Sequence, residues 1–180
     1  LPLIVKPLRD EASRGISQAS IVDDEEALIE RVKFIHQSVK MDAIAEDYIE
    51  GRELYVSVMG NKRIKVLTFR EMRFGRFPED EARIATYKAK WDSAYRQKWG
   101  IKNVFAGKLA EGLDKKIADI ARRAYRVLNM QSYARFDMRV TPAGSVYIIE
   151  GNANPCLARF DEMAQSAEKA GIPYERLVQK

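Results

Sequence analysis

The sequence predicts an α+β protein whose sheets are largely antiparallel. Two pairs of segments alternate between apolar and polar side chains around a short turn, which is typical of β-hairpins, namely residues 53–59 with 63–69 and residues 134–140 with 146–155. Two further segments carry apolar side chains three or four residues apart, which is typical of amphipathic helices, namely residues 23–39 and 114–128. Paired strands together with separate helices define the α+β class.

The first third of the chain is expected to contain a strand, a loop, a helix and a second strand. Leu3–Val5 is a short apolar strand, which Pro7 extends because the residue before a proline avoids the helical conformation. Residues 9–16 combine small side chains, a hydroxyl and a glycine, which suits a loop whose N–H groups wrap around a phosphate. The Asp23-Asp24 pair predicts the start of the first helix, and residues 41–45 lead into a strand.

The later elements follow from helix caps and breakers. Asp114 is expected to cap the clearest helix. Residues 161–170 are expected to be helical because Gly171 and Pro173 follow them, and residues 174–178 predict a last turn or short helix. Between the two hairpins the signals are weaker: residues 73–85 are expected to form a loop, and no pattern decides the structure of residues 92–111.

The register of the second hairpin decides what it can do. If Pro142–Ser145 form a four-residue loop, Thr141 pairs with Val146, and Asp137 then lies directly opposite Glu150. Two carboxylates this close repel each other unless a cation lies between them, and carboxylate oxygens suit a hard ion such as Mg²⁺. A slip of one residue would move the two carboxylates to opposite faces of the sheet.

The same register brings Arg135 opposite Asn152. The amide oxygen of Asn152 suits the same hard ion, and the guanidinium of Arg135 offers two parallel donors to a phosphate or an oxyanion. The alternative interpretation is a surface hairpin whose charges are solvated, and the hairpin alone does not decide between the two.

Composition limits the class of protein. The 180 residues suit one domain or two small lobes, and 46% hydrophobic with 32% charged residues is typical of a soluble globular protein. No apolar run approaches the roughly 20 residues of a membrane span, so no membrane partner is expected. The formal net charge of +5 favours anionic ligands, nucleotides included, without requiring nucleic acid.

The scarcity of cysteine and histidine excludes several kinds of site. Cys156 is the only cysteine, which rules out an internal disulfide and a cysteine-rich zinc site and fits a reducing, cytoplasmic location. His36 is the only histidine and lies far from Cys156 in the sequence, which argues against Cys-His or Ser-His-Asp catalysis. Cys156 is therefore expected to be structural rather than nucleophilic.

A nucleic-acid partner is the less favoured alternative. Residues 69–77 interleave aromatic residues with Arg70, Arg73 and Arg76, an arrangement that could stack on single-stranded bases. The alternation of a strand explains the same pattern, and the sequence has no RNA-binding signature.

Several motifs occur in a characteristic order. A strand is followed by Lys6-Pro7, and a small-residue loop and an acidic linker precede Tyr-Lys-Ala-Lys at 87–90, Arg-Phe-Asp at 135–137 and Glu-Gly-Asn-Ala-Asn-Pro at 150–155. Over all 180 residues this order resembles the ATP-grasp superfamily, and most of all its D-alanine–D-alanine ligase branch. The resemblance implies an ATP-grasp fold of two α+β lobes that hold a nucleotide between them. Residues 1–53 would be part of the small lobe and residues 54–180 the large lobe, without the family's N-terminal domain.

The resemblance also implies roles for single residues. In the small lobe it implies that Lys6 contacts the ATP phosphates and that a mobile loop closes over them, formed by Ser13, Arg14 and Gly15. It also implies an adenine hinge that acts largely through backbone groups, formed by Glu46, Asp47, Tyr48 and Ile49. Glu53 would bind the ribose hydroxyls, and Lys90 would be a second phosphate ligand. In the second hairpin it implies that two Mg²⁺ ions, or Mn²⁺ as an alternative, are bound by Asp137, Glu150 and Asn152. It further implies that Arg135 stabilises the reacting phosphate and the tetrahedral intermediate.

The implied function is an ATP- and Mg²⁺-dependent carboxylate–amine ligase that acts through an acyl phosphate. Its partners would be ATP and small carboxylate and amine compounds, with a homodimer left open. The alternative is a non-catalytic, nucleotide-binding regulatory module of the same fold. The chain departs from the ligases after Asn-Pro, where it has Cys156–Asp161 instead of Gly-Met and hydroxyl-bearing residues, and at Glu11-Ala-Ser13 instead of Glu-Gly-Ser. The sequence therefore does not identify the acceptor substrate.

Overall fold

The computed structural model describes residues 2–179 and divides the chain into two compact units. The first unit comprises Leu1–Glu50 and Arg73–Lys102, and the second comprises Gly51–Met72 and Asn103–Lys180. This division differs from the boundary expected after residue 53 chiefly because residues 73–102 group with the N-terminal segment. Leu1 and Lys180, the outer ends of the two expected lobes, lie outside the described residues.

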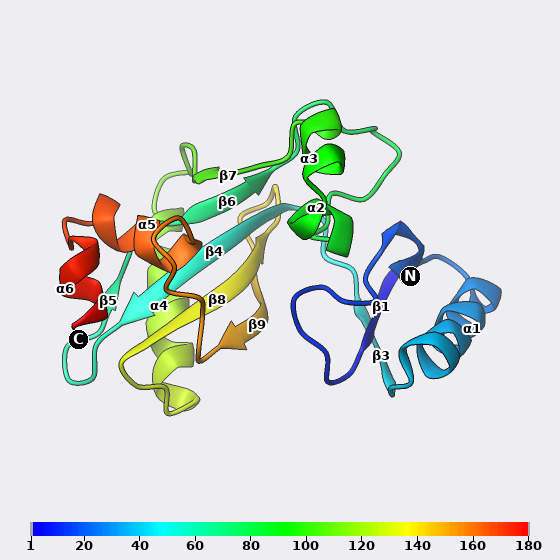
Figure 1. Cartoon of the computed structure of the whole chain (residues 1–180), viewed down its shortest axis with the longest axis horizontal. Coiled ribbons are helices and arrows are strands. Elements are labelled where there is room, and N and C mark those ends of the chain that lie inside the picture. The colour runs from blue at the N-terminus through cyan, green and yellow to red at the C-terminus, as the bar shows by residue number, and fades with distance from the viewer. Residues whose placement is uncertain (1, 180) are drawn as a thin grey trace. The chain divides into compact units, whose positions relative to one another are not determined.

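The first unit is built on a three-stranded antiparallel sheet of order β2-β1-β3 (Figure 1). Its strands are β1 (Leu3–Pro7), β2 (Ile21–Val22) and β3 (Ala43–Asp47), and its long helix is α1 (Glu25–Phe34), preceded by the 3₁₀ turn η1 (Gln18–Ser20) and continued by the π-helical turn η2 (Ile35–Val39). Asp24 caps α1 by accepting a hydrogen bond of 2.8 Å from the N–H of Ala27, which confirms the predicted start. Val5, Val22 and Ile35 form a small buried core.

Two short helices complete the first unit, and the sequence did not predict them. They are α2 (Tyr87–Trp91) and α3 (Ser93–Trp99). Thr86 and Asp92 cap them by accepting hydrogen bonds from N–H groups of the first turns, and Gly100 ends α3 in the left-handed conformation. Because the two helices have five and seven residues, neither is long enough to show an apolar period.

The second unit contains a six-stranded sheet in which β7, β6, β4, β8 and β9 lie in this order and β5 pairs with β4. Its strands are β4 (Arg52–Met59), β5 (Lys65–Val66), β6 (Arg70–Arg73), β7 (Lys102–Phe105), β8 (Tyr133–Val140) and β9 (Val146–Asn152). β4 runs antiparallel to β5, β6 and β8, and β8 runs antiparallel to β9. Both predicted hairpins are therefore present, although β5 is much shorter than residues 63–69. β6 lies within residues 69–77, whose alternation is explained by a strand, whereas β7 was not predicted.

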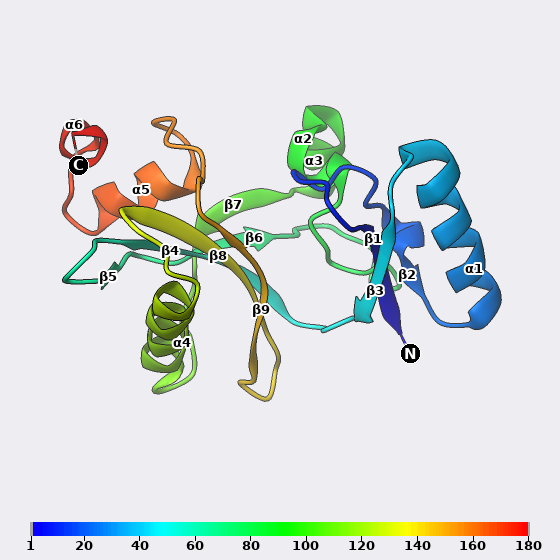
Figure 2. The same cartoon turned by 90° about the horizontal axis from the view of Figure 1, so that it is seen from below.

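Helix α4 (Leu113–Val127) covers one face of this sheet (Figure 2). Its buried residues Ile117, Ala121 and Tyr125 pack against Leu54 and Phe136 of the strands in a continuous apolar core. The sequence predicted the helix, but it was wrong about the cap. Gly112, not Asp114, occupies the cap position, and Asp114 lies in the first turn, where an acidic side chain favours the helix dipole.

The C-terminal helices lie at the opposite face of the sheet from α4 (Figure 2). They are α5 (Glu162–Lys169) and α6 (Tyr174–Val178), which confirms both predictions. Met163, Ala164 and Ala167 of α5 form a second core with Met59 and Leu67. No helix within residues 2–179 is long and apolar enough to cross a membrane.

Candidate functional site

A set of buried polar side chains shares the sheet face opposite α4. The pairing of β4 with β8 sets Tyr55 against Asp137 and Ser57 against Arg135. Since alternate residues of a strand point to opposite faces, these side chains point away from the core to which Leu54 belongs. We call this set the polar face; it consists of Glu53, Tyr55, Ser57, Arg135, Asp137 and Arg139.

The register at one end of the β8/β9 hairpin is as predicted, with the pairs Asp137–Glu150 and Arg135–Asn152. The prediction was wrong at the other end. There Val140, not Thr141, pairs with Val146, so the loop is one residue longer. A β-bulge at the step from Asp137 to Met138 absorbs the extra residue of β9. Without the bulge, the register of the turn would place Glu150 on the core face.

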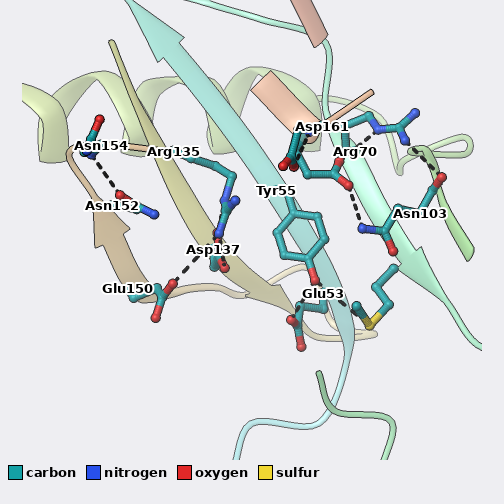
Figure 3. Close-up of polar contacts among 12 residues, drawn as sticks. Glu53, Tyr55, Arg70, Asn103, Arg135, Asp137, Glu150, Asn152, Asn154 and Asp161 are labelled. Carbon is teal, nitrogen blue, oxygen red and sulfur yellow. Dashed lines mark hydrogen bonds and ion pairs between the residues drawn. The ribbon is translucent and has the colours of Figure 1, made fainter. Parts of the chain in front are cut away.

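Arg135 and Asp137 form a two-pronged ion pair on the polar face (Figure 3). Nε and Nη2 of Arg135 donate to the two carboxylate oxygens of Asp137 at 2.7 and 3.1 Å. Nη2 also lies 4.0 Å from Oε1 of Glu150, whose side chain is half exposed. Burial lowers the pKa of Arg135, but the attraction of Asp137 outweighs it, so the pKa is raised above its ordinary value. The guanidinium is therefore permanently charged.

The loop after β9 is held by short side-chain contacts. The side-chain oxygen of Asn152 accepts a hydrogen bond of 2.8 Å from the N–H of Asn154. Figure 3 shows this contact between Asn152 and Asn154. The side-chain oxygen of Asn154 in turn accepts a hydrogen bond of 3.1 Å from the hydroxyl of Tyr133. Asn152 is thus fixed on the same strand as Glu150, two residues further along.

Glu53 is buried at the other end of the polar face, and each of its two carboxylate oxygens accepts a hydrogen bond. Its Oε2 accepts a hydrogen bond of 2.8 Å from Nη2 of Arg139, and its Oε1 accepts one of 3.2 Å from the hydroxyl of Tyr55. Nη1 of Arg139 donates to the carbonyl of Gly51 at 3.0 Å. Burial, with the nearby charges of Glu53 and Asp137, raises the pKa of Tyr55 well above its ordinary value, so its hydroxyl stays a donor.

The donor set of the hairpin fits a hard divalent cation. Asp137, Glu150 and Asn152 present two carboxylates and one amide oxygen from adjacent strands, and hard ions such as Mg²⁺ prefer oxygen ligands. Each oxygen that accepts from Arg135 retains a second lone pair. Within residues 2–179 no cluster of three or more Asp, Glu, His or Cys side chains could hold a metal. Mg²⁺ commonly uses only one or two protein carboxylates together with water and phosphate oxygens, so two carboxylates suffice.

In the first unit, the predicted lysine and one hinge residue are in contact. Lys6 lies on β1 and forms an ion pair with Glu46 on the neighbouring strand β3. The other predicted hinge residues continue this strand: Asp47 ends β3, and Tyr48 and Ile49 follow it, the N–H of Tyr48 donating to the carbonyl of Pro2 at 3.1 Å. The side-chain contact of Lys6 therefore joins two segments that the sequence assigned to the same nucleotide.

The predicted phosphate loop adopts a strained backbone. Ala12, Ser13 and Gly15 all have positive φ angles, of 56°, 61° and 70°. Such angles turn successive N–H groups in unusual directions, which is how backbone nests for anions are formed. Ser13 is largely buried, whereas the side chain of Arg14 is 70% exposed.

Side chains from two helices hold this loop through its carbonyl oxygens. Nη2 of the buried Arg31 on α1 donates both to the carbonyl of Gly15 and to the hydroxyl of Ser20, the latter at 2.9 Å. On α2, Nε1 of Trp91 donates to the carbonyl of Ala12 at 2.9 Å. The sequence indicated no role for either residue: Arg31 belongs to no motif, and Trp91 only ends the Tyr-Lys-Ala-Lys-Trp segment in which Lys90 was the residue of interest.

Two other predicted basic residues have clear places. Lys90 lies on α2, within the same unit as Lys6 and the loop, rather than with the residues after 54. Arg70 is buried and forms an ion pair with Glu162, Nε to Oε2 at 2.9 Å, and its Nη2 donates to the carbonyl of Asn103. Arg70 is therefore unavailable to nucleic acid, which weakens that alternative.

Comparison with known proteins decides the family. The family model described as "D-ala D-ala ligase C-terminus" matches residues 1–180. The chain belongs to this family. It is 30% identical over 177 residues to the uncharacterized protein y4sG of Sinorhizobium fredii, covering 98% of this chain and 50% of that protein. It is also 30% identical over 178 residues to a D-alanine–D-alanine ligase of Shouchella clausii, covering 99% of this chain and 45% of that protein.

Solved structures of the same family share the fold. The D-alanine–D-alanine ligase of Bacillus anthracis superposes with a TM-score of 0.75 at 26% identity, over 99% of this chain and 52% of that one. The complex of the same ligase with ATP superposes with a TM-score of 0.73 at 24% identity, over 99% of this chain and 50% of that one. The predicted ATP-grasp fold and the predicted branch are therefore confirmed. The chain spans about half the length of the relatives it matches.

Proposed function

We propose that this member of the D-Ala-D-Ala ligase C-terminal family is the nucleotide-binding core of an ATP- and Mg²⁺-dependent carboxylate–amine ligase. The observation that carries the proposal is the polar face with its neighbours on β9. Asp137 and Glu150 are paired across two strands, Asn152 lies beside them, and Arg135 is held against Asp137. The structure of a related ligase complexed with ATP supports the choice of nucleotide.

Each residue of this group has a task in phosphoryl transfer to a carboxylate. Mg²⁺, when bound, would neutralise negative charge on the transferring phosphoryl group. Asp137, Glu150 and Asn152 would hold the ions. Arg135 would donate to the phosphoryl oxygens and then to the oxyanion that forms when an amine attacks the acyl phosphate. Its ion pair with Asp137 aims the guanidinium before any substrate arrives.

The first unit would bind the phosphates and adenine. We propose Lys6 and Lys90 as phosphate contacts, residues 13–15 as the loop that covers the phosphates, and Glu46–Ile49 as the segment that recognises adenine. Positive φ angles at Ala12 and Ser13 support a loop whose N–H groups bind an anion. Water must be kept from an acyl phosphate, which a loop closing over it would achieve.

Further features of the proposal come from the sequence. Glu53 is proposed to accept from the ribose hydroxyls through lone pairs left by Arg139 and Tyr55. Small carboxylates and amines are the proposed substrate classes. A homodimer, Mn²⁺ in place of Mg²⁺ and the cytoplasmic location stay predictions.

Calorimetric titration of the chain with a non-hydrolysable ATP analogue and Mg²⁺ tests the proposal. Asp137→Ala and Glu150→Ala are each expected to weaken Mg²⁺-dependent binding by tenfold or more, on the order of a lost charged ligand. Asp119→Ala is the matched control, because Asp119 is an exposed acid on α4 that pairs only with Arg122 among the contacts described. Wild-type affinity in both site variants would reject the metal site and with it the ligase assignment.

A further inference from the structure

The polar face contains two ion pairs, Glu53 with Arg139 and Arg135 with Asp137, and we call these its two clusters. Tyr55 contacts Glu53 of one cluster and Arg135 of the other, and the proposed function gives it no role. The residue is 2% exposed, on a strand whose neighbouring positions on the same face are Glu53 and Ser57. Figure 3 shows its ring between Glu53 and the Arg135–Asp137 pair, with the hydroxyl directed to Glu53. An aromatic ring that contacts both clusters can set the position of both.

The hydroxyl of Tyr55 fixes the carboxylate of Glu53. It donates to Oε1 at 3.2 Å, while Arg139 donates to Oε2 at 2.8 Å, so each carboxylate oxygen has a separate donor. Two donors on opposite oxygens hold a carboxylate in one rotamer and one plane. The hydroxyl also lies 4.0 Å from the sulfur of Met72, which is a weak acceptor, so its stronger hydrogen bond goes to Glu53.

The ring of Tyr55 contacts the guanidinium of Arg135. The Cζ atom of Arg135 lies 5.3 Å from the ring centroid, within the range of about 6 Å in which a cation is attracted to an aromatic face. Asp137 holds the same guanidinium from its edge at 2.7 and 3.1 Å. The arginine is therefore fixed by two different groups, an acid at its edge and a ring at its face.

We propose that Tyr55 is a positioning residue that aligns Glu53 with the ribose and Arg135 with the phosphates of one nucleotide. This inference rests on the proposed function, and it divides the side chain into two parts. The hydroxyl acts through Glu53 on the sugar, and the ring acts through Arg135 on the phosphate chain. Removing the two parts one after the other should therefore change different portions of the binding free energy.

The test compares two ligands in the presence of Mg²⁺, the β,γ-methylene analogues of ATP and of 2′,3′-dideoxy-ATP, by calorimetric titration of the full chain. Tyr55→Phe removes the hydroxyl alone. It is expected to weaken binding of the ATP analogue about five-fold and to leave the affinity for the dideoxy analogue unchanged, because only the ATP analogue has ribose hydroxyls for Glu53. Tyr55→Leu also removes the ring and is expected to weaken binding of both analogues, that of the dideoxy analogue by about five-fold.

A second buried tyrosine provides the control. Tyr125 lies on the core-facing side of α4 and is 1% exposed, and its hydroxyl has no hydrogen-bond partner among the described residues. Tyr125→Phe should leave the affinity for both analogues unchanged. Melting temperatures of all variants show whether a change in affinity merely follows a loss of folding.

Two results would overturn the inference. Equal weakening of both analogues by Tyr55→Phe would show a general effect on the fold, and no weakening of either would show that Glu53 needs no help. A wild-type chain that binds neither analogue would instead refute the proposed function, and the inference would fall with it. If the wild-type chain binds both analogues and Tyr55→Phe binds them equally well, the inference about Tyr55 fails while the proposed function stands.

Discussion

The polar face and the loop at residues 10–16 are both built from polar groups, but they keep their shape in different ways. On the polar face, side chains stand on regular strands and bond to one another, as Arg135 does to Asp137 and Arg139 to Glu53. In the loop, the backbone itself is strained and its carbonyl oxygens are held from outside by Arg31 and Trp91.

This difference follows from what each region must do if the proposed function is right. Metal ligands and an arginine gain from fixed geometry, which a sheet supplies because its backbone is already bonded. A loop that opens and closes over phosphates cannot be bonded into a sheet, so it depends on a few replaceable donors. Substitutions in the two regions should therefore differ in size and in kind.

The largest effect is expected on the polar face. Asp137→Ala would leave the guanidinium of Arg135 buried without its main partner, at a cost of about 3–5 kcal/mol in the free energy of unfolding. Urea denaturation measures this loss, and Asp119→Ala, an exposed acid on α4, should cost less than about 1 kcal/mol. Equal losses in the two variants would show that the polar face is no more rigid than an ordinary surface.

Arg31 should give the second largest effect. Arg31→Met removes the donor that joins the carbonyl of Gly15 to the hydroxyl of Ser20, and we expect a loss of about 2 kcal/mol in unfolding free energy. Lys33→Met, on the exposed side of the same helix, is the matched control. If both variants unfold at the same urea concentration, Arg31 does not hold the loop.

The backbone strain of the loop predicts a smaller effect. A Cβ atom at Gly15 would lie 2.9 Å from the ring of Pro7, and the φ angle of +70° already disfavours any side chain. Gly15→Ala should cost about 1–2 kcal/mol. Gly144→Ala isolates the crowding, since Gly144 has a similar φ angle but nothing within 4 Å. A shift in thermal melting no larger for Gly15→Ala than for Gly144→Ala would contradict the close packing of the loop on Pro7.

Trp91 should have the smallest effect on stability and a visible effect on opening of the loop. Its side chain is 60% exposed, so Trp91→Phe should cost less than about 1 kcal/mol while removing the donor to the carbonyl of Ala12. We expect trypsin to cleave faster after the exposed Arg14. Cleavage after Lys62, in the turn between β4 and β5, serves as the internal reference. Unchanged cleavage after Arg14 would mean that Trp91 does not restrain the loop.

The sequence was informative where a pattern is local. Helix α1 begins at the acidic cap, α5 ends before Gly171, and both hairpins lie where side chains alternate. Short elements escaped prediction: α2 and α3 are too short to be periodic, and β7 has only four residues. Arg31 and Tyr55 escaped as well, because their roles come from contacts with residues distant in sequence or on a neighbouring strand.

By itself, the sequence determined the family and the α+β class, and it predicted which residues would ligate a metal. These depend on side-chain identity and on the period of a strand, which are written along the chain. The sequence predicted that Glu150 faces Asp137, but only the tertiary structure revealed the five-residue loop and the β-bulge that together give this register. The tertiary structure alone also placed Tyr55 between Glu53 and Arg135, since a contact between strands depends on register and not on local pattern.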